Sequence, residues 1–386
     1  MRTHVARLLC LFGCVACAKN TAVAPEPAVQ ELHFAEAPTM RVRLASLGKR
    51  NEILLRASGQ IVIESGSAKL KREGRAVLAV QRGGLALDGD PLPTDSVRVT
   101  AIGGMVQIGD AAYSGDLVCQ LNGGMGGIVV TNHVRMENYV LGVLRGELPL
   151  PRVPQAAAEA QAIAVRSYAL HYLINPERDY DVDDTTLFQR YVGFHRAPDD
   201  EQLRLGVLAT TGEYLLSEGK PLKAYYHSTC GGHTTDPQHG LEPDDPVPLR
   251  GVKCDHCKAS KYYRWDATLS DEAILRAADM TGSLEGAEVT LRDTAGRASA
   301  ITIRTDEQTA SVPASAFRLA IGPSKLRSTN IRSIERVDGG LHIKGAGWGH
   351  GVGLCQMGAI GLALKGKSGE EIVAYYYPDA QIRKAY

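Results

Sequence analysis

The stretch Met136-Glu-Asn-Tyr-Val-Leu-Gly-Val-Leu-Arg-Gly-Glu-Leu-Pro149 marks the point at which the chain turns from strand-forming to helix-forming sequence. It predicts a short helix over 137–145 that ends near Gly146. One acidic residue, Glu147, follows at a turn beside apolar residues. A carboxyl group in such a place suits general acid catalysis, because burial raises its pKa and keeps it protonated. The alternative is an ordinary solvated loop glutamate, which is the more common situation.

The sequence on either side of this stretch predicts an α+β fold. Before it, strand patterns recur with turn residues between them, at 41–44, 53–55, 60–63, 97–100, 113–117 and 127–132. After it, small and apolar residues at helical spacing predict a long helix over 155–174 that Asn175-Pro176 ends. Further strands are expected over 288–291 and 299–303, and helices over 311–319, over 354–365 and after the capping box at Ser368.

Strands and helices are mixed without βαβ regularity, which is typical of the α+β class. We expect a β-rich N-terminal region over 40–134 and a mixed α/β core with irregular loops. Within that core, residues 135–260 hold a cluster of cysteine and histidine, and a C-terminal region over 261–386 holds a glycine-rich loop.

The charge balance limits the classes of partner. The 386 residues include 43 Lys and Arg against 43 Asp and Glu, so the formal net charge is zero. This gives no electrostatic basis for binding nucleic acid. An uncharged polymer or a small ligand is at least as good a candidate.

The first residues have the form of an export signal. Basic residues at Arg2 and Arg7 precede an apolar run over 8–16, which is too short to span a bilayer, and Cys17 follows it. This order predicts a lipoprotein signal over 1–17 with acylation of Cys17, and a flexible tether over 18–39. The protein is then expected in the cell envelope or periplasm, anchored to a membrane by lipid. The alternative is plain secretion after cleavage near Ala18.

Cysteine and histidine residues in the middle of the chain are spaced like metal ligands. Cys230 lies between His227 and His233, and the pair Cys254 and Cys257 follows. The three cysteines with one of the two histidines would form a tetrahedral zinc site, with His239 and His256 as spare ligands. Four protein ligands leave no open position, so this zinc would be structural. The alternative is a disulfide between Cys254 and Cys257, which an exported protein permits.

The glycine-rich run over 345–356 is the second candidate site. Trp348 could stack on a sugar ring, and His350 and Gln356 could supply polar contacts. The run lacks the Lys-Ser/Thr of a phosphate-binding Walker loop. The alternative is a turn whose glycines serve close packing.

A third polar segment runs from Asp179 to Gly193. Its acids lack the spacing of a calcium-binding loop, so a solvated loop or the wall of a groove is the better interpretation. Arg166, on the predicted long helix, could bind an acid or a substrate, or could be an ordinary surface charge.

Taken together, these segments resemble the family of stage II sporulation protein D and the amidase enhancers (SpoIID/LytB). The matching motifs are Glu137-Asn-Tyr-Val-Leu-Gly-Val with Gly146-Glu-Leu-Pro149, Ala158-Glu-Ala-Gln-Ala-Ile-Ala-Val-Arg166-Ser-Tyr-Ala169, Asp184-Thr-Thr186 with Gln189, Tyr191 and Gly193, Tyr226-His-Ser-Thr229 with Gly231-Gly232 and Thr234, Gly347-Trp-Gly-His-Gly-Val-Gly-Leu-Cys-Gln-Met-Gly-Ala359, and Tyr376-Tyr-Pro378. They occur in a consistent order over about residues 40–383.

The resemblance implies a lytic transglycosylase that cleaves peptidoglycan glycan strands, with Glu147 as its catalytic acid. A hydrolase that used water would need two carboxyl groups, whereas a lytic transglycosylase needs one, because a hydroxyl of the substrate is the nucleophile. Substrate-binding residues are then expected at Gln161, Arg166, Gln189, Tyr191, Trp348, His350 and Gln356.

Two other functions remain open. The protein could be a non-enzymatic glycan-binding enhancer of a cell-wall amidase, as the resemblance also allows. It could instead be a zinc hydrolase, in which case removing the metal would abolish activity without unfolding the protein.

Overall fold

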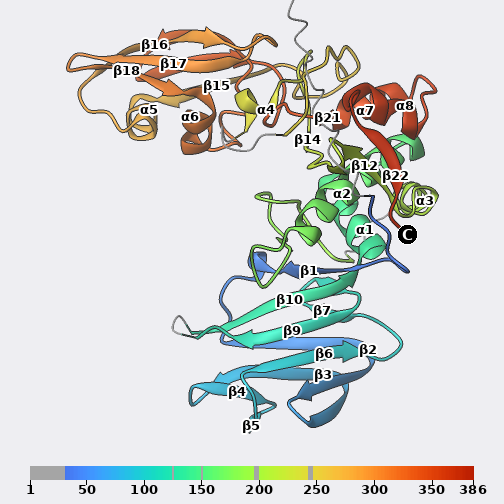
Figure 1. The fold of residues 1–386 in the computed structure, drawn as a ribbon. Helices are drawn as coiled ribbons and strands as arrows, with labels where there is room; N and C mark the ends of the chain where they lie inside the picture. The colour runs from blue at the N-terminus through green and yellow to red at the C-terminus, as the bar shows by residue number, and fades with distance from the viewer. Residues whose placement is uncertain (1–30, 124–125, 149–150, 195–199, 242–246) are drawn as a thin grey trace, which may run out of the picture.

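The computed structural model describes residues 31–123, 126–148, 151–194, 200–241 and 247–386. The predicted signal peptide, with Cys17, lies outside these residues. The described chain combines helices with several β-sheets, and the sheets dominate, as the α+β prediction expected. Figure 1 shows the large N-terminal sheet at one end, a group of helices in the middle and a separate lobe beside them.

The N-terminal region is an eleven-stranded sheet in the order β11-β1-β10-β9-β6-β2-β3-β4-β5, with β7 and β8 attached through β2. Pairing is antiparallel throughout except between β1 and β11. Alternate side chains of its strands, such as Ile61 and Ile63, are fully buried and form the core. The strands are β1 (Thr39–Arg43), β2 (Glu52–Ser65), β3 (Ala68–Gln81), β4 (Gly84–Leu87), β5 (Asp90–Pro91), β6 (Ser96–Ala101), β7 (Val106–Ile108), β8 (Ala111–Tyr113), β9 (Asp116–Leu121), β10 (Ile128–Arg135) and β11 (Val182–Asp183), with a 3-10 turn at Ala45–Leu47.

Helix α1 (Met136–Glu147) follows β10 without a loop, and α2 (Gln155–Ile174) follows α1. Helix α2 has the predicted bounds and is buried on all sides over most of its length, because its many alanines allow neighbours to approach closely. It packs against α1, α3 (Glu201–Ala209), α7 (Gln356–Ala363) and α8 (Gly369–Tyr376). The capping box predicted for α8 is present, with Ser368 and Glu371 exchanging hydrogen bonds.

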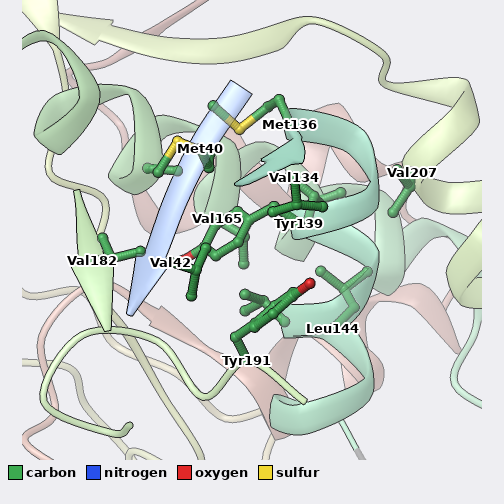
Figure 2. Close-up of a cluster of buried hydrophobic side chains, with 14 of the residues drawn as sticks. Met40, Val42, Val134, Met136, Tyr139, Leu144, Val165, Val182, Tyr191 and Val207 are labelled. Atoms are coloured by element: carbon green, nitrogen blue, oxygen red, sulfur yellow. The ribbon is translucent and has the colours of Figure 1, made fainter. Parts of the chain in front are cut away.

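A hydrophobic cluster fixes α1 against the sheet. Figure 2 shows Met40 and Val42 of β1 with Val182 of β11 on one side, and Tyr139 and Leu144 of α1 facing them. These side chains are fully buried. The position of α1, and therefore of the carboxyl group at its end, is set by the core of the N-terminal sheet.

Residues 265–345 form a lobe with a hydrophobic core of its own, here called the inserted lobe. One sheet has the order β15-β20-β19 and the other β16-β17-β18. Its apolar centre includes Trp265, Ile274 and Phe317. The elements are β15 (Trp265–Ser270), α5 (Asp271–Ala278), β16 (Leu284–Arg292), β17 (Ala298–Thr305), β18 (Thr309–Pro313), α6 (Ala314–Ile321), β19 (Ile331–Val337) and β20 (Gly340–Gly345).

After the inserted lobe the chain returns to the helical core. Strand β21 (Leu354–Cys355) pairs in parallel with β14 (Tyr226–His227). Strand β12 (Glu213–Ser217) pairs with β13 (Lys220–Pro221) and with β22 (Gln381–Lys384). A short helix, α4 (Pro237–Gly240), completes the set. Over the part of the chain that the structure describes, no helix combines the length and apolarity needed to cross a membrane.

Three helix boundaries differ from those expected, each for a local reason. Helix α1 continues through Gly146, so Glu147 lies in its last turn rather than in a loop. The helix expected over 354–365 begins at Gln356, because the two preceding residues pair with β14. The helix expected over 311–319 begins at Ala314, because Thr309–Pro313 pairs with β17.

Candidate functional site

Glu147 lies at the end of α1, half-buried, where one segment of loop holds its side chain. The backbone N–H of Arg190 donates to Glu147 Oε1 at 2.8 Å. Burial raises the pKa of Glu147, and the hydrogen bond and charge of Arg190, with the nearby Gln356 side chain, lower it less. In the part of the chain that the structure describes, the main influences on this pKa are burial, Arg190 and Gln356, and none of these is a carboxylate. Burial therefore holds the Glu147 carboxyl group toward its protonated form.

Two glycines of α1 bring the loop over 184–194 against the helix. A Cβ atom at Gly146 would lie 2.1 Å from the carbonyl oxygen of Arg190, and one at Gly142 would lie 2.4 Å from the ring of Tyr191. Arg190 Nη1 also donates to the carbonyl of Gly146 at 3.2 Å. The glycines thus permit the close approach that places the Arg190 N–H on Glu147.

Several buried polar atoms near this carboxyl group complete no hydrogen bond. Burial raises the pKa of Tyr226, and the nearby Glu147 carboxylate raises it further. The Gln189 side chain approaches the Tyr226 hydroxyl, but this buried hydroxyl completes no hydrogen bond. Gln189 accepts a hydrogen bond from Tyr139 at 2.9 Å, but its Nε2 is buried and unpartnered. Gln356 approaches Glu147, yet its Nε2 completes no hydrogen bond. Buried polar groups normally have hydrogen-bond partners, so we expect water or a polar ligand to bind to these atoms.

Gln161 and Tyr191 occupy different environments. Gln161 of α2 is 1% exposed, and neither polar atom of its side chain has a partner. Tyr191 is buried in the core, stacks on Tyr139 and donates its hydroxyl to Asn132 at 2.8 Å. Tyr191 therefore lies in the core, where it packs on Tyr139, the residue that donates a hydrogen bond to Gln189.

Arg166 is a fully buried member of an ion pair. Its Nε and Nη2 donate to the two carboxylate oxygens of Glu137 at 3.0 and 2.6 Å. Its Nη1 donates to the carbonyl of Glu213 at 2.8 Å. Glu137 also accepts hydrogen bonds from the Gly212 N–H and the Tyr386 hydroxyl. The structure thus joins Arg166 to the scaffold that holds α1, rather than to Glu147.

The glycine-rich loop reaches the site through β21 and positions Tyr226. His350 Nδ1 accepts a hydrogen bond from the Val352 N–H at 3.1 Å, so Nε2 carries the proton and donates to the carbonyl of Tyr226 at 2.9 Å. Burial lowers the pKa of His350 to about 3, which keeps the ring neutral. Trp348 is half-buried with its ring against the edge of Tyr262, 4.2 Å between centroids.

Four cysteines come together where the sequence predicted a metal site, and the fourth of them is not a predicted ligand. The Sγ atoms of Cys230, Cys254, Cys257 and Cys355 all lie within 4.8 Å of one another and are buried. None of these cysteines forms a disulfide. The structure does not bring the two predicted histidines into the group, because His227 Nδ1 donates to the carbonyl of Val352 and His233 Nδ1 to that of Thr234.

Local geometry shows that this cluster suits a metal bound by sulfur. Four thiolates about 2.3 Å from zinc would be roughly 3.8 Å apart, and Cys230 and Cys257 lie at 3.5 Å. Donors also point at the sulfurs: Cys230 N–H lies 3.2 Å from Cys355 Sγ, and the Tyr376 hydroxyl lies 3.1 Å from Cys254 Sγ. Such outer contacts are typical of metal-thiolate sites. Sequence spacing missed Cys355, which lies in another motif, although Cys355 and Cys119 were the two cysteines after the signal region to which no role had been assigned.

The carboxylates at 181–184 form hydrogen bonds with other groups of the protein. Asp181 binds Arg41 through two oxygens, and Asp184 accepts from the Ser46 N–H at 2.9 Å. Asp183 caps the following turn through Thr185. These carboxylates fasten the loop to β1 and thereby hold Gln189 and Arg190 in place.

Comparison with known proteins identifies the family. The model of the stage II sporulation protein (SpoIID) family matches residues 125–216, and a domain of unknown function matches residues 251–353. The chain is 32% identical to an uncharacterized protein of Brachyspira hyodysenteriae over 66% of this chain and 68% of that protein. It is 30% identical to stage II sporulation protein D of Bacillus amyloliquefaciens over 66% of this chain and 75% of that protein.

A more distant relative is the amidase enhancer of Bacillus subtilis, 25% identical over 61% of this chain and 39% of the relative. The first match covers Glu147, Arg166, Gln189 and Arg190. The second covers Cys254, Cys257 and the inserted lobe. On these similarities, the chain belongs to the stage II sporulation protein D family.

Proposed function

We propose that this protein is a lytic transglycosylase of the cell envelope that cleaves peptidoglycan glycan strands between N-acetylmuramic acid and N-acetylglucosamine. The observation that carries the proposal is the environment of Glu147: a half-buried carboxyl group whose pKa is raised by burial, with no carboxylate among the described groups that contribute most to its pKa. A water-dependent glycosidase places a second carboxyl group across the bond. One carboxyl group suffices when the substrate supplies its own nucleophile.

The chemistry uses Glu147 twice. The protonated carboxyl group donates its proton to the glycosidic oxygen while the bond from that oxygen to C1 of the muramoyl residue breaks. The resulting carboxylate then takes the proton from the C6 hydroxyl of the same residue, and O6 forms a bond with C1. The product is a 1,6-anhydromuramoyl end, and Glu147 is again protonated. The raised pKa favours the first step, because the acid must be protonated at the start.

The unpartnered groups around Glu147 would hold the sugars. The hydroxyl of Tyr226 and the amides of Gln189 and Gln356 are buried donors without partners, which is the complement of a substrate rich in hydroxyl and acetamido oxygens. Gln161 is a further unpartnered amide. In this proposal His350 and Tyr191 position Tyr226 and Gln189, Arg166 fixes α1, and Trp348 borders the groove with Tyr262.

The metal in this proposal is zinc, and its role is structural. Cys230, Cys254, Cys257 and Cys355 would occupy all four positions of a tetrahedral ion and leave none for substrate. This arrangement argues against a zinc hydrolase. Export through the signal at 1–17 and a lipid anchor at Cys17 complete the proposal and place the enzyme in the envelope, beside its glycan substrate.

The decisive test is incubation of the purified protein with glycan strands stripped of stem peptides, followed by mass spectrometry. Wild type should release fragments with anhydromuramoyl ends. Glu147→Gln should release none, and Glu370→Gln, which changes an exposed glutamate on α8, should match wild type. Products with ordinary reducing ends, or equal activity of Glu147→Gln and wild type, would contradict the mechanism.

A second function is supported by the similarity to an amidase enhancer. In that case the protein would bind glycan and stimulate a separate N-acetylmuramoyl-L-alanine amidase without cutting strands itself. Stimulation of an amidase on intact peptidoglycan by both wild type and Glu147→Gln, with no anhydro products from either, would favour the enhancer over the enzyme.

A further inference from the structure

Arg297 of the inserted lobe is buried against the four-cysteine cluster. It precedes β17, has 0% exposure, and its Nη2 donates to the carbonyl of Cys230 at 2.7 Å. A Cβ atom on Gly351 would lie 2.4 Å from Arg297 Cζ, so the glycine-rich loop closes the other side of the guanidinium group. One side chain of the inserted lobe thus reaches between two segments of the core.

The guanidinium group has too few partners for its charge. Its Nε and Nη1 are buried and have no hydrogen-bond partner. Asp293 is near, but its oxygens accept from the backbone N–H of Arg297 and the hydroxyl of Thr235. A buried cation with unpaired donors is strongly unfavourable unless an opposite charge lies close. The nearby groups able to carry that charge include Asp293 and three cysteines of the cluster, Cys230, Cys355 and Cys257.

A loaded cysteine cluster has the charge that Arg297 needs. Four thiolates around a divalent ion carry a net charge of −2, and this cluster is buried, so water cannot neutralise it. We propose that Arg297 is the counter-charge of the metal-loaded cysteine cluster and that metal binding therefore fastens the inserted lobe to the core. The inference rests on the structural metal of the proposed function and not on glycan cleavage.

The coupling has a direction that can be measured. In the metal-free protein Arg297 is a buried cation that weakens the contact between lobe and core. In the loaded protein the same side chain offsets the charge of the thiolates. Metal should therefore bind more weakly when Arg297 is neutral, whereas the metal-free protein should be no less stable.

The test compares wild type with Arg297→Met and Arg297→Lys, using Co²⁺ and Zn²⁺. Cobalt–thiolate absorption reports binding at the cluster, and Zn²⁺ competition gives the affinity. Arg297→Met should weaken metal binding at least tenfold. The free energy of unfolding of the metal-free protein should stay unchanged or rise slightly. Arg297→Lys, which keeps the positive charge, should lose less metal affinity than Arg297→Met. The control is Arg292→Met, an exposed arginine of the same lobe bonded to the Gly296 and Ile331 carbonyls, which should leave affinity unchanged.

Cys355→His supplies an internal check, because an imidazole in place of a thiolate lowers the net charge to −1. In that background Arg297→Met should weaken metal binding by a smaller factor. Metal should also slow tryptic cleavage after Lys258 and Lys261, which join the core to the lobe, in wild type but less in Arg297→Met. An equal loss of stability in the metal-free and loaded Arg297→Met protein, or unchanged affinity, would overturn the inference. A wild type that binds no metal would overturn it together with the zinc site, while leaving the glycan assay as a separate result.

Discussion

Arg166 and Glu137 form a two-pronged ion pair in which the arginine is fully buried and the glutamate side chain is 20% exposed. The pair joins α2 to the first turn of α1, whose last turn carries Glu147. An arginine in a family motif invites a role in substrate binding. Its contacts in this structure indicate that it fixes the helix that carries Glu147.

Breaking this pair should destabilise the protein before it affects chemistry. Arg166→Met leaves Glu137 as a largely buried charge without its partner, and removal of one member of a buried pair costs about 3–5 kcal/mol. Urea unfolding should show that loss, and Arg166→Met with Glu137→Gln should lose less than the sum of the two single changes. A stable Arg166→Met protein with normal unfolding but no activity would instead point to a contact with substrate.

The ionisation of Glu147 should lower both the free energy of unfolding and the activity as pH rises. Burial raises its pKa in the folded protein, so the folded state holds this proton more tightly than the unfolded state. The favourable contribution is present below the unfolded pKa and is lost as pH rises through the folded pKa. Glu147→Gln should therefore raise the free energy of unfolding at pH 8 relative to wild type, with little effect at pH 4.

The activity of wild type should fall on the alkaline side as Glu147 loses its proton. Denaturant unfolding at the two pH values, beside a rate profile on denuded glycan, checks both statements. A stability difference between wild type and Glu147→Gln that grows toward acid pH would contradict the sign.

Gly146→Ala should reverse the usual effect of alanine in a helix. Replacing glycine by alanine in a helix normally stabilises it by about 1 kcal/mol. Here a Cβ would lie 2.1 Å from the Arg190 carbonyl and must push away the segment whose N–H binds Glu147. We expect lower stability and at least tenfold lower activity. Gly286→Ala, whose added Cβ would meet nothing within 4 Å, is the matched control and should leave activity unchanged.

Tyr226→Phe should separate binding from folding. The hydroxyl of Tyr226 is buried without a partner, so its removal should leave the melting temperature unchanged or slightly higher. If that hydroxyl binds the glycan, kcat/KM should drop by about tenfold or more. Equal loss of stability and activity would show that the hydroxyl serves the fold.

Metal removal should distinguish the two ligand sets. Cys355→Ser should lose metal binding, whereas His233→Ala should keep it, because the structure groups Cys355 with the other three cysteines. Chelation should lower the melting temperature, and any protein that remains folded should still cut glycan. Metal analysis of the purified proteins measures the bound ion. Full metal binding by Cys355→Ser would indicate that the fourth ligand is a histidine and not Cys355.

The sequence was informative where local rules decide the structure. The alanine-rich pattern of α2, the capping box at Ser368 and the strands of the N-terminal region follow from spacing and propensity alone. Glu147 could be singled out because the residues around it match a family motif. Three features depend on contacts between segments far apart in the chain. They are the ion pair of Arg166, the burial of Tyr191 and the position of Cys355 beside the other three cysteines. No spacing rule supplies those contacts, because the inserted lobe lies between Cys257 and Cys355.

The hydrogen bond from Tyr386 to Glu137 joins residues 249 positions apart. Helices and hairpins form from neighbouring residues within microseconds, whereas contacts of such separation wait until most of the chain has collapsed. The anchor of α1 is therefore completed late in folding, after β22 has paired with β12. Glu147 is then held firmly only once the whole chain is in place, so under the proposed function an incompletely folded molecule would lack cleaving activity.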